Sequence, residues 1–130
     1  MSRDYQRLKN NPYYLQRPLY RMTLAFIRDH ERKVSEYNAL AEASPPPSEG
    51  QIRSFAAGSP TERAGIKRAE MRVAIDAVNE ALALVPPEYR KGVWESVAYY
   101  KRYPDDASKS TYARHKQHFI YQVARNMYWV

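Results

Sequence analysis

Apolar residues recur every three or four positions in several stretches of this chain, which is the repeat that lines one face of an α-helix. The first such stretch, residues 19–43, contains neither glycine nor proline, so it predicts one long helix. Charged residues between Asp29 and Lys33 interrupt its apolar stripe. The stripe is expected to pack against other helices of the chain or, alternatively, against a second copy in a homodimer. It comprises Leu15, Leu19, Met22, Phe26, Tyr37 and Leu40.

Residues 44–59 separate this helix from the next one. They hold three consecutive prolines, two glycines and four serines, a composition that cannot continue a helix and predicts an exposed connection. Ser59, Pro60 and Glu62 then form a capping-box pattern, which marks the start of a second helix that ends before Pro86. The predicted buried stripe of this helix consists of Met71, Ala74, Ile75, Val78, Ala81, Leu82 and Val85.

A third helix is predicted from Pro87 to about Tyr100, with Gly92 allowing a neighbouring element to approach closely. Its inward residues are Tyr89, Val93, Trp94 and Val97. A fourth helix is predicted from Ser108 or Ser110 to about Tyr128. It should bury Tyr112, Phe119, Ile120, Val123 and Met127.

No stretch alternates between apolar and polar residues for long enough to predict a strand, so the expected fold class is all-α, a small helical bundle. The chain of 130 residues suits one compact domain. Within it, residues 1–43 form a basic N-terminal segment and long helix, residues 44–59 the connection, and residues 60–130 the core helix and the C-terminal region.

The composition excludes several classes of function but does not by itself assign one. A net charge of +7 favours polyanionic partners, nucleic acid first. The absence of cysteine removes disulfides and thiolate catalysis, and it fits a cytoplasmic protein. No apolar run approaches the ~20 residues of a membrane helix. No nucleotide-binding or nucleophile motif is present, so we expect neither an enzyme nor a cofactor, and His115 with His118 lacks the further ligands of a metal site.

The outer face of the predicted fourth helix carries mostly hydrogen-bond donors, and its small residues come first. A recognition helix presents its first turns to the major groove, where small side chains allow close approach and arginine reaches guanine. The exposed face of any basic helix has the same look, so this alternative stays open. The donors are Lys109, Ser110, Arg114, Gln117 and His118. Flanking phosphates are assigned to two groups of cations, either of which could also be a simple solvated face. The N-terminal group is Arg3, Arg7, Lys9, Arg17 and Arg21, and the group on the second helix is Arg63, Lys67, Arg68 and Arg72.

The last two predicted helices, "ALVPPEYRKGVWESVAYYKRYPDDASKSTYARHKQHFIYQVARNM", resemble the C-terminal part of the RinA and ArpU group of phage late-gene transcriptional activators. That region is itself similar to the region-four helix-turn-helix of sigma factors. The resemblance implies a C-terminal helix-turn-helix-like unit with a recognition helix at about 108–127. It also implies a regulator of late promoters that binds double-stranded DNA, with RNA polymerase as a further candidate partner. The DNA contacts it implies are Ser110, Thr111, Arg114 and Lys116, with Lys109, Gln117 and His118 nearby.

One departure from that pattern leaves alternatives open. Between Tyr103 and Ser108 there is room for a single turn, so either the helix with Trp94 and Val97 supports the recognition helix, or the last helix does not read DNA. The rival interpretations are a helical module that grips an acidic protein partner and an RNA-binding protein whose tyrosines stack on bases.

Overall fold

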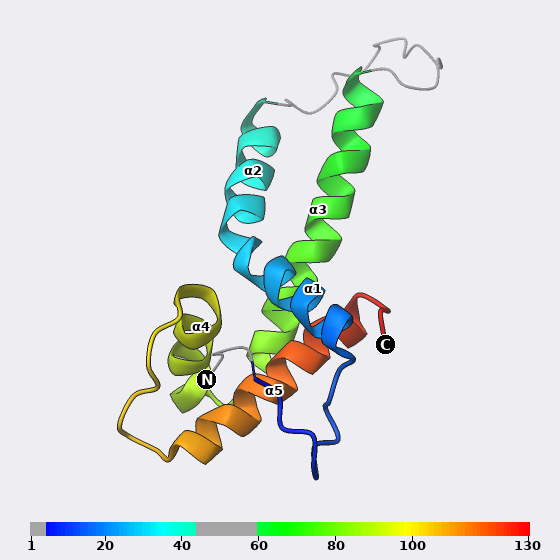
Figure 1. The fold of residues 1–130 in the computed structure, drawn as a ribbon. Coiled ribbons are helices and arrows are strands. Elements are labelled where there is room, and N and C mark those ends of the chain that lie inside the picture. Colours follow the sequence, from blue (N-terminus) through cyan, green and yellow to red (C-terminus); the bar gives the residue numbers. More distant parts are fainter. Residues whose placement is uncertain (1–4, 44–59) are drawn as a thin grey trace.

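The computed structural model describes residues 5–43 and 60–130, and this part of the chain is helical without any strand (Figure 1). The predicted all-α fold class is therefore confirmed. The connection at 44–59, including the serine of the predicted capping box, lies outside the described residues. The helices are α1 (Arg17–Arg28), α2 (His30–Ala43), α3 (Pro60–Ala83), α4 (Pro87–Tyr99) and α5 (Lys109–Asn126).

The hydrophobic core lies where α1, α3, α4 and α5 meet. The predicted stripes of the last three helices supply most of it, because their apolar residues repeat with the period of the helix. α1 adds Leu24 and Ile27, and Leu15 enters the core from just before that helix. From the other helices, the fully buried residues include Val78, Val93, Val97, Tyr112, Phe119, Ile120 and Val123. Met127 is only half-buried at the end of α5.

Local signals in the sequence explain why α4 and α5 begin and end where they do. Pro87 occupies the first helical position of α4, and Tyr100 ends the helix in the left-handed conformation, with φ of 58°. Ser108 caps α5, because its Oγ accepts a hydrogen bond from the backbone N–H of Thr111 at 3.1 Å. Both helices therefore lie within a residue or two of their predicted bounds.

Gly92 allows α4 to approach α5, as predicted. A Cβ atom on this glycine would lie 2.6 Å from the ring of Tyr112 and 2.8 Å from Pro104. The buried Tyr112 ring stacks on Tyr103, and its hydroxyl donates a 2.5 Å hydrogen bond to Asp106. That hydrogen bond, together with burial, raises the pKa of Tyr112 to about 12. Tyr112 thus fastens the connection between the two helices to the core.

The prediction of one long first helix is wrong, because the chain bends at Asp29, between α1 and α2. Asp29 has φ of −88° and ψ of 1°, and its carboxylate accepts two hydrogen bonds from Arg32 at 2.6 and 2.7 Å. The bend lets His30 turn inward, where it is buried against Trp94.

The buried face of α1 also differs from the predicted stripe. Met22 is exposed, and the buried residues are Tyr20, Thr23, Leu24 and Ile27. These residues repeat at three and four positions just as the predicted set does, so the period alone could not choose between the two faces.

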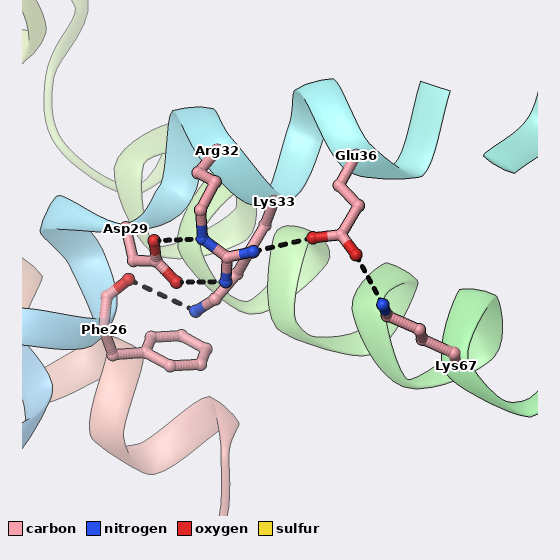
Figure 2. Close-up of polar contacts among 6 residues, drawn as sticks. All are labelled: Phe26, Asp29, Arg32, Lys33, Glu36 and Lys67. Carbon is pink, nitrogen blue, oxygen red and sulfur yellow. Dashed lines mark hydrogen bonds and ion pairs between the residues drawn. The ribbon is translucent and has the colours of Figure 1, made fainter. Parts of the chain in front are cut away.

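Beyond the bend, α2 runs antiparallel to the first half of α3 and the pair stands out from the other helices (Figure 1). We call this unit, α2 with residues 60–73 of α3, the arm. Among its described side chains only His30 is buried. Glu36 joins the two helices, because it pairs with Arg32 at 2.6 Å and with Lys67 at 2.5 Å (Figure 2).

Candidate nucleic-acid interface

The first two turns of α5 present a polar face to solvent. Lys109, Ser110 and Arg114 are exposed, and none of them has a hydrogen bond or ion pair with another described side chain. Ser110 and Arg114 are four residues apart and so share one face of the helix. Tyr112, halfway between them, points to the opposite side and is fully buried. The orientation that a recognition helix needs is therefore present.

Two further predicted contacts lie at the edge of this face. Thr111 is half-buried, and its hydroxyl lies 2.8 Å from the capping Ser108 Oγ. Lys116 is also half-buried, and it lines a cleft beside Lys109. Of the predicted set, these two residues contribute less exposed surface than Lys109, Ser110 and Arg114.

Gln117 and His118 hold another part of the chain. The Gln117 side-chain amide donates hydrogen bonds to Gln6 Oε1 at 3.0 Å and to the Tyr13 carbonyl at 2.9 Å. The His118 ring lies 4.4 Å from the Tyr13 ring, centroid to centroid. Their contact with DNA stays a prediction, but both side chains are already engaged in positioning the N-terminal segment.

That segment, residues 5–15, forms an ordered loop against α5, which we call the N-terminal loop. Gln6 is its main fastening, since the side chain is buried and exchanges two 2.9 Å hydrogen bonds with the backbone of Leu15. Asn11 closes a turn by donating to the Arg7 carbonyl at 2.8 Å, and Asn10 has a positive φ of 56°. The Asn-Asn-Pro sequence is a turn signal, but nothing in the local pattern indicated docking on α5.

Two hollows flank the start of α5. One, of about 590 Å³, lies between the N-terminal loop and α5 and is lined by Arg7, Asn10, Ser110 and Arg114 among others. The second, of about 550 Å³, lies between α5 and the connection from α4, and its lining includes Arg102 and Lys109. Six cations and the carboxylate of Asp105 line the two hollows, and one of the cations, Lys101, is paired with Glu95 at 3.5 Å. We call four of the others the basic end: Arg7, Arg102, Lys109 and Arg114. Within the described residues, none of these four is paired with a carboxylate.

The four cations of α3 assigned to flanking phosphates belong to the arm, which Figure 1 shows well away from the start of α5. Lys67 is paired with Glu36, and Arg72 is paired with Asp76 at 3.1 Å. Arg68 lies over the ring of Tyr37 at 5.5 Å, and Arg63 is exposed. Their contact with phosphates stays a prediction, but they do not share a surface with the basic end.

α4 packs behind α5 in the position of a supporting helix. Trp94 contacts Phe119 edge-on, with ring centroids 6.4 Å apart, and the buried Val93 and Val97 complete the contact. The connection from Tyr100 to Ser108 contains only a turn, and it is longer than the ~3–4 residues of a usual helix-turn-helix. The packing of α4 on α5 is compatible with both alternatives, a supporting helix or a bundle whose last helix does not read DNA, so the helix-turn-helix-like unit stays a prediction.

The two histidines of α5 are held by different aromatic partners. His115 stacks on Tyr89 at 4.7 Å, and burial, with nearby Arg114, lowers its pKa. In residues 5–43 and 60–130 no group of three or more histidine, aspartate or glutamate side chains is placed to hold a metal ion. The same part of the chain contains no helix with the length and apolar character needed to cross a bilayer.

Comparisons with known proteins give no match to this chain, whether with protein-family models, with curated proteins or with solved structures. The resemblance of residues 83–127 to phage late-gene activators therefore remains an expectation that depends on the sequence pattern.

Proposed function

We propose that this protein is a sequence-specific DNA-binding transcriptional regulator, of the phage late-gene activator type, which places the start of α5 in the major groove. In this proposal Arg114 and Ser110 face base edges, because an arginine reaches guanine O6 and N7 and a small residue lets the helix approach. Lys109 and Arg102, beside the cleft at the start of α5, contact phosphates on the flank.

The observation that supports this proposal most is the exposure of Ser110 and Arg114 on the first two turns of a helix whose other face is buried. Helix N-termini also attract phosphate, because their first backbone N–H groups have no partner inside the helix. The cations beside this helix start suit a polyanion, and a duplex supplies phosphates at high density.

Selection from randomised duplexes with the purified protein tests the proposal. The wild-type chain should enrich a motif, and Arg114→Ala should relax one position of that motif by ~1–3 kcal/mol. Arg125→Ala is the matched control, since Arg125 is exposed on the last turn of the same helix and its replacement removes the same charge. Enrichment of no motif by the wild-type chain, or equal relaxation by both variants, would contradict the proposal.

An acidic protein partner is the rival that one observation favours. Because Gln117 and His118 are engaged with the N-terminal loop, the free reading face of α5 is short. A surface of unpaired cations would also suit clustered carboxylates. In the selection experiment this rival predicts no enriched motif. It also predicts that polyglutamate and duplex DNA compete equally well for binding to the protein.

A further inference from the structure

Several hydrogen bonds and ring contacts hold the N-terminal loop beside the reading face of α5, by which we mean the exposed face with Ser110 and Arg114. Gln6 joins its two ends through Leu15 and also accepts a hydrogen bond from Gln117, a residue 111 positions away in the sequence. Tyr13 adds ring contacts with His118 and with Tyr121, the latter at 5.3 Å. Buried hydrogen bonds of this kind are costly to break, so the loop holds a fixed place on the helix.

The side chains that the loop leaves free face the same hollow as the reading residues. Asn11 uses its amide within the loop, since it donates to the Arg7 carbonyl and accepts from the backbone N–H of Tyr13. Asn10 and Arg7, by contrast, are exposed and have no side-chain partner among the described residues. Both line the hollow of about 590 Å³ that Ser110 and Arg114 line from the other side.

We propose that the N-terminal loop is a second DNA-contacting element, in which Asn10 contacts a base edge next to the site of α5 and Arg7 contacts a phosphate. This inference rests on the proposed function of α5 and extends the sequence that the protein reads. The chemistry fits, since the asparagine amide pairs with adenine N6 and N7 and an unpaired guanidinium suits a phosphate. The occupant is double-stranded DNA, because the hollow opens beside the helix face that enters the groove.

Two substitutions remove the side chains that are proposed to contact DNA and keep the fold of the loop. Asn10→Gly removes the amide and keeps the turn, because glycine adopts a φ of 56° without strain. Arg7→Ala removes the charge and leaves the backbone carbonyl that Asn11 uses. Arg125→Ala, at an exposed arginine on the last turn of α5, is the matched control for the removed charge.

Duplex selection with these variants, followed by affinity measurements over a range of salt concentrations, tests the inference. Asn10→Gly should lose discrimination at one flanking position, a change of roughly 5- to 100-fold between best and worst base, and keep the position read by Arg114. Arg7→Ala should weaken all duplexes alike and lower the salt slope by about 0.9, whereas Arg125→Ala should keep the wild-type slope.

The enriched motifs also separate a failure of the loop from a failure of the proposed function. If the wild-type chain enriches a motif and Asn10→Gly enriches the identical motif, the loop does not read DNA and this inference alone is overturned. If the wild-type chain enriches no motif, the proposed function fails and the inference fails with it. A Gln6→Ala variant adds a positioning test, since releasing the loop should remove the flanking position while the motif of α5 persists.

Discussion

The arm and the basic end both carry clustered cations, but they differ in how many of these cations are paired with carboxylates. In the arm, Arg32 pairs with Asp29 and Glu36, and Lys67 pairs with Glu36 (Figure 2). At the basic end, the four cations around the start of α5 have no carboxylate partner among the described residues. The two regions therefore contribute unequally to the unpaired positive charge of this protein, whose net charge is +7.

Composition alone could not locate the surface for a polyanion, because it does not distinguish paired cations from unpaired ones. A cation already paired within the chain must give up that partner before it can contact a phosphate, whereas an unpaired one need not. The arm uses its charges to hold two helices that share no deeply buried contact. The basic end leaves its charges available, beside a helix face that offers both small and cationic side chains.

The largest expected effect is on the salt dependence of duplex binding, when charge is removed from each region in turn. The triple variant Arg7→Ala, Arg102→Ala and Lys109→Ala should lower the salt slope of duplex binding by about 2.7, at roughly 0.9 for each phosphate that is no longer neutralised. The charge-matched arm variant Arg32→Ala, Lys67→Ala and Arg72→Ala removes three cations that are paired with carboxylates, and it should keep the wild-type slope. Binding to a random-sequence duplex at several salt concentrations measures both. An equal decrease in the two variants would erase the distinction between the regions.

An added methyl group should have opposite effects at two glycines, one in α4 beside α5 and the other in the arm. Gly92→Ala should lower the free energy of unfolding by about 1–3 kcal/mol, because its methyl group would overlap the Tyr112 ring and Pro104. Gly65→Ala, in the arm, meets nothing within 4 Å and should raise that free energy by about 0.5–1 kcal/mol. Urea denaturation of the two variants measures both changes. Stabilisation by Gly92→Ala would show that α4 and α5 are not closely packed there.

The weakest effect concerns the response of the arm to acid. The hydrogen bond from Lys67 is the main cause that holds the pKa of Glu36 below its ordinary 4.5. Because the folded pKa is lowered, the stability from this pair is complete above pH 4.5 and is lost as the pH falls through the lowered value. Carboxyl NMR titration should show the midpoint of Glu36 rising toward 4.5 in Lys67→Met and staying low in Lys109→Met. A midpoint that does not respond to Lys67→Met would refute the pairing.

Much of the helical part of this fold followed from local sequence. The prolines at 60 and 87 and the serine at 108 mark helix starts, and the apolar period of α5 identified Tyr112, Phe119, Ile120 and Val123 as core. The exposure of Ser110 and Arg114 followed from the same period. These features depend on residues within a few positions of one another, which is the range over which sequence patterns carry information.

The bend at Asp29 and the docking of the N-terminal loop did not follow from local sequence. Aspartate within an apolar repeat is compatible with an unbroken helix, and the contact of the buried His30 with Trp94 joins residues far apart in the sequence. The loop depends on a hydrogen bond between Gln6 and Gln117, which no local pattern links. Long-range contacts between polar side chains leave no periodic signal.

The start of α5, and not the arm, is the face that we expect to meet DNA. Amide NMR spectra of the protein, recorded with and without a duplex that carries its enriched motif, distinguish the two surfaces residue by residue. We expect the largest shifts on residues 108–117 and on the N-terminal loop, with residues 31–42 and 60–73 unchanged. Shifts confined to the arm, or an α5 whose first two turns do not respond, would contradict this assignment.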